Sequence, residues 1–200
     1  MSIPRDSAPA PILKGIVNER ESQLRLVTSV RLRWMAVLGQ LAAIAAVTLL
    51  YGFPVNIGSC LVLIAMSAWL NVFLSIRYPV RHRLTTPFAF GLLVYDLLQL
   101  AGLLYLTGGI QNPFSVLLVA PVTVASATLP PRYTIFLGGM VIVAGMLLIN
   151  YHYPLPWYNG MRFELPRDYK IGALLALIAS MGFMAFFTWR LNKELSLIHI

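Results

Sequence analysis

Two polar side chains inside one apolar run are the first candidates for chemistry. Asp96 and Gln99 interrupt residues 88–106 and share a helix face by their i,i+3 spacing. A charged Asp in the middle of a membrane helix costs about 2.5–3.5 kcal/mol, so such a residue faces other protein groups and often serves function. The pair is either the polar wall of a ligand cavity or a clamp between helices. Gln40 and Asn71, in other apolar runs, are candidate clamp partners.

The second candidate is the turn at residues 107–114, which reads TGGIQNPF. Gly108 suits the left-handed position after a helix, and Gly109 permits a close approach to the backbone. Asn112 and Pro113 suit the N-cap and first position of the next helix. One interpretation is a tight helical hairpin. The other is a small ligand pocket, in which free N–H groups bind a carbonyl and Phe114 offers a ring for stacking.

The composition places both candidates in a membrane protein. The 200 residues are 58% hydrophobic and 11% charged, with a mean hydropathy of +0.76, whereas soluble domains contain about 25% charged residues. The net charge of +8 does not indicate nucleic-acid binding, because the basic residues sit in blocks beside apolar segments. With one cysteine, Cys60, and no spaced histidine partners, the sequence predicts no catalytic and no metal-binding residues.

Six apolar runs each approach the roughly 20 residues that cross a bilayer. Backbone groups in lipid must be hydrogen-bonded within their own segment, so the runs predict helices. The runs are residues 34–51, 57–76, 88–106, 113–129, 133–151 and 171–189. The predicted fold is therefore an all-α polytopic membrane protein with six transmembrane helices.

The basic residues predict the orientation of these helices. Twelve of the 15 Lys and Arg residues lie in the N-terminal segment, the second and fourth loops and the tail. The other three are Arg162, Arg167 and Lys170. Because cytoplasmic loops carry the excess of Lys and Arg, both termini are predicted to be cytoplasmic and the turn at 107–114 periplasmic.

The flanking segments complete the predicted organisation. Residues 1–33 form a cytoplasmic segment in which 15–33 is either a basic amphipathic helix on the membrane surface or a positive flank. Residues 34–189 form the membrane domain, and 190–200 begin a cytoplasmic stalk. Residues 195–200 (LSLIHI) are either a translated sequencing-adaptor end or a real continuation of the last helix. The loop at 152–168 is either a lid on the bundle or a plain connector.

The stretch at residues 95–114 resembles the membrane region of RegB/PrrB-type redox-sensing histidine kinases. That family carries a GGxxNPF heptapeptide between its third and fourth of six spans. Gly108 through Phe114 match the heptapeptide in the same place. Residues 31–40 are also similar to that family, and the resemblance covers about residues 20–194.

The resemblance implies a bacterial inner-membrane sensor whose kinase is controlled by the redox state of ubiquinone. The implied quinone-binding residues are Gly108, Gly109, Asn112, Pro113 and Phe114. Asp96 and Gln99 are candidate polar support only, since they lie about 14–18 Å down the third helix from the turn. The implied partners are the lipid bilayer, a second copy of the chain and a response regulator. ATP would bind a kinase core beyond residue 194.

Other functions make different demands on the sequence. A small transporter predicts paired broken helices in its two halves, but only the fourth run has an interior proline, Pro121. A quinone-reactive enzyme subunit predicts haem histidines or cysteine pairs, which the sequence lacks. A sensor region coupled to a different output domain remains open.

Overall fold

Long helices joined by short turns build the protein, and the computed structural model describes residues 26–78, 84–155 and 163–198. The described helical segments are α2 (Leu26–Ala45), the π-helical η1 (Ala46–Leu50), α3 (Ile57–Arg77), α4 (Thr86–Leu106), the 3₁₀ segments η2 (Gly109–Gln111) and η3 (Pro113–Leu118), α5 (Val119–Thr128), α6 (Pro131–Asn150) and α7 (Arg167–Ile198). Most of the predicted amphipathic helix at 15–33 lies outside the described residues, as do residues 156–162 of the predicted lid.

Five of the helices are long and apolar enough to cross a membrane. They are Thr28–Leu50, Ile57–Arg77, Thr86–Leu106, Pro131–Asn150 and Arg167–Leu191. The first begins before residue 34, so Arg33 lies inside a continuous helix rather than in a flank. The all-α polytopic fold predicted from the sequence is confirmed.

The fourth predicted run is a shorter apolar helix, Pro113–Thr128, and it changes character along its length. Its first 6 residues are 3₁₀ and its last 10 are α-helical. Pro121 explains the change, because its ring crowds the carbonyl of residue 117 and it lacks an N–H to bond there. A 3₁₀ residue rises about 2.0 Å against 1.5 Å for an α residue, so the segment reaches about 27 Å, close to the bilayer's roughly 30 Å core.

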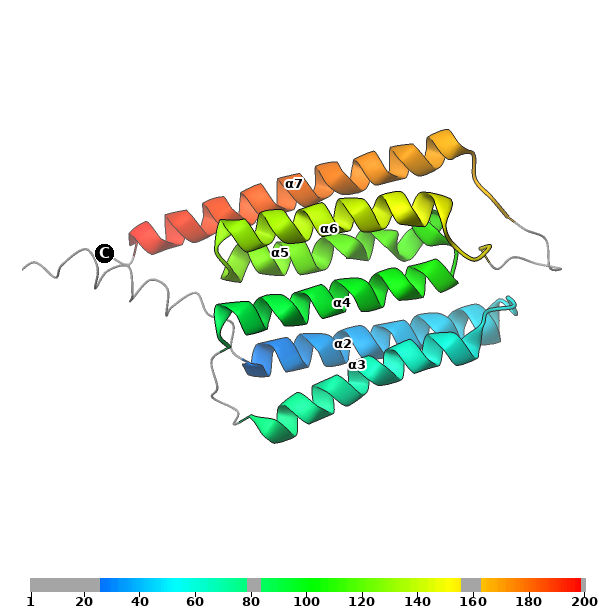
Figure 1. Ribbon diagram of the computed structural model, residues 1–200, viewed down its shortest axis with the longest axis horizontal. Coiled ribbons are helices and arrows are strands. Elements are labelled where there is room, and N and C mark those ends of the chain that lie inside the picture. Colours follow the sequence, from blue (N-terminus) through cyan, green and yellow to red (C-terminus); the bar gives the residue numbers. More distant parts are fainter. Residues whose placement is uncertain (1–25, 79–83, 156–162, 199–200) are drawn as a thin grey trace, which may run out of the picture.

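The helices lie side by side along one direction (Figure 1). The start of α2 and the end of α7 are at one end of the bundle, and the turn between α4 and η3 is at the other. An even number of crossings requires this arrangement of the chain ends. The turn and the end of α7 therefore lie at opposite ends of the bundle.

Packing divides the bundle into a core and a side pair. Helices α4, α5, α6 and α7 enclose the largest apolar core, which includes the fully buried Leu118, Ala125 and Val141. Helix α2 packs against α3, and this pair is tied to α4 by a smaller cluster around Cys60 and Leu103. This arrangement leaves space between α2 and the α4–α5 side of the core.

Candidate ligand site between α2, α4 and α5

A cavity of about 630 Å³ occupies the space between α2, α4 and η3–α5. Its lining is mostly apolar and includes Leu100, Leu103 and Leu117. Asn112, Pro113 and Phe114 line one region, and Arg33, Gln40, Asp96 and Gln99 line another. Members of both candidate sets of the sequence thus line one cavity, although they are far apart along α4. A mostly apolar cavity of this size with few polar groups is typical of small-molecule sites.

The two glycines of the turn pack against the neighbouring loop, away from the cavity lining. Gly108 has φ 113° and Gly109 has φ 66°, both in the left-handed region. A Cβ on Gly108 would lie 3.1 Å from the Cα of Leu155, and one on Gly109 would collide with the carbonyl oxygen of Leu148. The predicted left-handed position of Gly108 and the close approach at Gly109 are therefore confirmed. Both glycines serve the fold of the turn.

Asn112 caps the helix that follows it. Its side-chain oxygen accepts a hydrogen bond from the Phe114 N–H at 2.9 Å. Its Nδ2 donates to the Thr107 carbonyl at 2.9 Å and to the Thr107 hydroxyl at 2.8 Å. The predicted N-cap is confirmed, with Pro113 at the first helical position. Phe114, which is 45% exposed, presents its ring at the edge of the cavity.

Gln111 ties the turn to the loop before α7. Its side-chain oxygen accepts from the Leu165 N–H at 3.0 Å, and its Nε2 donates to the Phe163 carbonyl at 3.5 Å. The N–H of Tyr153 donates to the Tyr105 carbonyl at 2.8 Å, which joins the other end of that loop to α4. The described parts of the 152–168 segment therefore pack onto the turn.

An ion pair joins α2 to α4 at the other region of the cavity. Arg33 Nε donates to Asp96 Oδ1 at 2.8 Å, and Nη2 donates to Oδ2 at 2.9 Å. This two-point geometry is the strong form of an Arg–carboxylate pair. The Arg33 side chain is 3% exposed and that of Asp96 31%. Asp96 thus has a charged partner in α2, whereas the sequence suggested only the uncharged Gln40 and Asn71 as clamp partners.

A pair of carboxamides joins the same two helices nearer the turn. Gln40 Nε2 donates to Gln99 Oε1 at 3.2 Å, and Gln99 Nε2 donates to Gln40 Oε1 at 3.0 Å. The sequence suggested Gln40 as a clamp partner, and the structure assigns it to Gln99. Asn71 instead donates to the Val30 carbonyl at 2.9 Å, between α3 and α2. The two bridges, 33–96 and 40–99, cross the side of the cavity.

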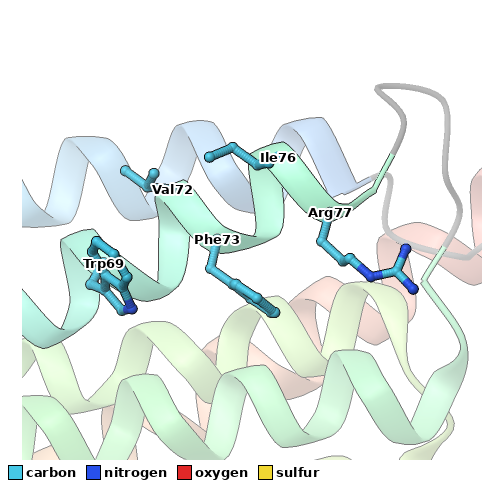
Figure 2. Close-up of a pocket in the computed structure, with 5 residues that line it drawn as sticks. All are labelled: Trp69, Val72, Phe73, Ile76 and Arg77. Carbon is cyan, nitrogen blue, oxygen red and sulfur yellow. The ribbon is translucent and has the colours of Figure 1, made fainter.

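A second hollow of about 330 Å³ lies on the surface of α3 (Figure 2). Trp69, Val72, Phe73, Ile76 and Arg77 line it. All five belong to one helix, and Trp69 and Ile76 are 73% and 82% exposed. An open apolar surface of this kind on a membrane helix suits contact with lipid chains. It contains none of the candidate residues.

The family of the chain follows from comparison with known proteins. Residues 24–197 match the PilS-like transmembrane domain, a six-span domain. The chain belongs to this family. It is also 37% identical over 183 residues to the sensor histidine kinase RegB of Cereibacter sphaeroides, and 37% identical over 185 residues to RegB of that species' strain ATCC 17023. Each match covers 90% of this chain and 40% of the relative. No solved structure matches the chain.

Membership of the PilS-like transmembrane family confirms the resemblance found in the sequence. The chain is a multi-pass protein of the inner membrane and corresponds to the membrane region of a sensor histidine kinase. It spans about 40% of the length of the curated relatives it matches. The cavity described above therefore lies within the membrane region.

Some residues of the site in this PilS-like domain were not found from sequence. Arg33 was counted with the basic flank, and Thr107 and Gln111 were not singled out. One signal was available, since Arg33 and Gln40 are seven residues apart and so lie on one face of a helix. No local pattern could show that this face lies opposite Asp96 and Gln99.

Proposed function

We propose that the chain is the membrane sensor module of a two-component, redox-responsive histidine kinase. In this proposal, ubiquinone binds in the cavity between α2, α4 and α5, near the turn between α4 and η3. Bound quinone signals to a cytoplasmic kinase core through α7. The cavity itself is the observation that carries the proposal, because it opens beside a heptapeptide that matches the one of RegB-type kinases.

The shape and lining of the cavity support a quinone. A quinone has a flat ring with two carbonyl acceptors and an apolar isoprenoid chain. The cavity volume of about 630 Å³ lies within the roughly 300–1,000 Å³ of ordinary small-molecule sites. Its α2 wall includes Ala36, Gly39 and Ala43, whose small side chains leave room for a flat ring. Phe114 offers a face for stacking.

The partners of the whole protein belong to the same proposal. The kinase core would carry the phospho-accepting histidine and bind ATP, and a response regulator would receive the phosphoryl group. The sensor would act as a homodimer, because its attached kinase core would work as a pair of chains. The basic-residue pattern supports a periplasmic position for the turn.

A matched pair of glycine substitutions tests the cavity as the quinone site. Gly39 and Gly91 both lie in helices, and a Cβ added at either meets nothing within 4 Å. Gly39 lines the cavity, whereas Gly91 does not. Gly39→Leu therefore fills part of the cavity without breaking any contact, and Gly91→Leu changes only the outer surface of α4. Equilibrium binding of short-chain ubiquinone is measured for the 200-residue chain in lipid nanodiscs.

The expected result is that Gly39→Leu weakens ubiquinone binding at least tenfold while Gly91→Leu binds as the parent does. Phe114→Ala is expected to weaken binding as well, because it removes an apolar contact surface at the cavity edge. Equal quinone affinity for the parent, Gly39→Leu and Phe114→Ala chains would show that the cavity is not the site. Absence of quinone binding by the parent chain would refute the proposed ligand.

A further inference from the structure

The hydrogen-bonding groups of the Asn112 side chain in the heptapeptide turn are already occupied. The Asn112 oxygen holds the Phe114 N–H, and its amide nitrogen holds the backbone and hydroxyl oxygens of Thr107. The Ser115 N–H donates to the Asn112 carbonyl at 2.9 Å. Asn112 is only 8% exposed. A quinone carbonyl could bind the Asn112 side chain only by breaking the cap of η3, so Asn112 offers the ligand no free donor.

Free hydrogen-bonding capacity lies instead at the carboxamide bridge between α2 and α4. Each carboxamide has two N–H groups and an oxygen with two lone pairs. Gln40 and Gln99 use one N–H and one lone pair each for their mutual bonds. Among the described residues, the second N–H of each carboxamide has no hydrogen-bond acceptor. Gln99 is 7% exposed, so this unused capacity lies within the protein and on the cavity wall.

Arg33 adds a further unpaired donor to the same wall. Its Nη1 is buried and has no hydrogen-bond partner among the described residues, whereas Nε and Nη2 bind Asp96. A buried donor without a partner is unfavourable by about 1–3 kcal/mol. Arg33 is 4% exposed and lines the cavity. An acceptor bound nearby would satisfy this group, directly or through a water molecule.

We infer that the quinone ring binds at the Gln40–Gln99 bridge, close to Arg33, and that the heptapeptide turn forms the edge of the cavity. This inference rests on the proposed function and places the ring within that site. The isoprenoid chain follows the apolar wall formed by Leu103 and Leu117 toward Phe114. The headgroup therefore lies deeper in the membrane than the turn, by roughly the 12 Å that separates residues 99 and 107 along α4.

The carboxamide bridge has the chemistry to respond to both redox forms. Oxidised quinone has carbonyl oxygens and only accepts hydrogen bonds, whereas the quinol has hydroxyl groups that also donate. A carboxamide offers N–H donors to the first and an oxygen acceptor to the second. Neither form requires a change in the charge of Gln40 or Gln99. The bridge can thus bind both forms with different hydrogen-bond arrangements, and a redox-dependent signal follows where the two arrangements favour different positions of the helices.

Photo-cross-linking of the unmodified chain tests the position of the ring. An azido-ubiquinone with the azide on the ring is bound to the 200-residue chain in nanodiscs and illuminated, and the labelled peptides are identified by mass spectrometry. The inference predicts labels within residues 36–43 of α2 and 96–103 of α4. Labels confined to residues 107–117 would place the ring at the turn and overturn the inference while leaving the proposed quinone function intact.

Infrared spectroscopy of ¹³C-carbonyl-labelled ubiquinone provides an independent readout. A hydrogen bond from Gln40 or Gln99 lowers the carbonyl stretching frequency of the bound quinone. Gln99→Leu and Gln40→Leu are expected to return that band toward its position in apolar solvent and to weaken binding about 3- to 10-fold, the effect of one ordinary hydrogen bond. Asn71→Leu is the matched control, since Asn71 is a buried carboxamide that does not line the cavity.

The outcomes distinguish this inference from the proposed function. An unshifted carbonyl band and unchanged affinity in both glutamine variants would refute the role of the bridge, even where Phe114→Ala weakens binding. A parent chain that binds no quinone would refute the proposed function and the inference together. A band shift as large in Asn71→Leu as in Gln99→Leu would show a general structural effect and overturn the inference.

Discussion

The two partners of the Arg33–Asp96 ion pair are buried to different degrees, so their substitution should destabilise the protein unequally. Asp96→Leu leaves the Arg33 guanidinium buried without its carboxylate, and loss of one partner of a buried pair destabilises proteins by about 3–5 kcal/mol. Arg33→Met leaves the Asp96 carboxyl, whose side chain is 31% exposed against 3% for Arg33 and which can become neutral by taking up a proton, as a guanidinium cannot. We therefore expect Asp96→Leu to reduce the free energy of unfolding more than Arg33→Met does.

The double variant separates the pair from its surroundings. Arg33→Met/Asp96→Leu removes both charges and places apolar side chains in a mostly apolar region, so it should be more stable than Asp96→Leu alone. The assay is reversible unfolding in mixed micelles with increasing dodecyl sulfate, followed by far-ultraviolet circular dichroism. The reasoning fails if Asp96→Leu lies within about 0.5 kcal/mol of the parent chain, the range of ordinary surface substitutions. Additive effects of the two single substitutions would refute the coupling between them.

Three further predictions concern the turn. Asn112→Ala should lower the free energy of unfolding by about 1–2 kcal/mol through loss of the N-cap. Asn112→Asp should lower it less, because it keeps the capping oxygen and loses only the donors to Thr107. Thermal melting of both variants in one detergent ranks them, and equal losses would contradict the capping role. Gly109→Ala should destabilise the protein by at least about 1 kcal/mol, because Gly109 has a positive φ. Gly139 lies in α6 with open space around it, so Gly139→Ala should be neutral or stabilising. Equal melting temperatures of the two variants would contradict the packing at Gly109. A topology reporter fused at Ile110 should be active only as a periplasmic reporter, and cytoplasmic activity would reverse the predicted orientation.

Elements with a local physical signature could be predicted from the sequence. The turn was predictable because left-handed glycines and an Asn–Pro helix start depend on a few consecutive residues. Apolar run length likewise predicted the helices, since lipid leaves the backbone few alternatives. The 3₁₀ start of the fourth run was not predicted. A run of apolar residues does not reveal how a proline in it changes the helix upstream.

The contents of the cavity depend on which helix faces which, and the sequence does not specify that locally. On the sequence alone, Asp96 and Gln99 are kept apart from the site at the turn because of their distance from it along α4, and that distance is correct. The structure shows that one cavity extends over that length. Arg33 illustrates the same difficulty, because a basic residue near a helix start is typical of a topological flank. Only its position opposite Asp96 distinguishes it from the other arginines of that segment.

The two bridges between α2 and α4 have different consequences for signalling. The ion pair at 33–96 holds the helices together through strong charge-assisted bonds, whereas the carboxamide bridge at 40–99 uses two neutral bonds at 3.2 Å and 3.0 Å. A ring bound through the unused groups of Gln40 and Gln99 perturbs the weaker bridge and leaves the ion pair intact. Helix α2 would then move about the Arg33–Asp96 contact rather than separate from α4. A tenfold difference in affinity between the two positions of α2 would shift their equilibrium by about 1.4 kcal/mol. Removal of the ion pair should therefore weaken the coupling between quinone and output even where quinone binding survives, because the fixed point of the motion is lost.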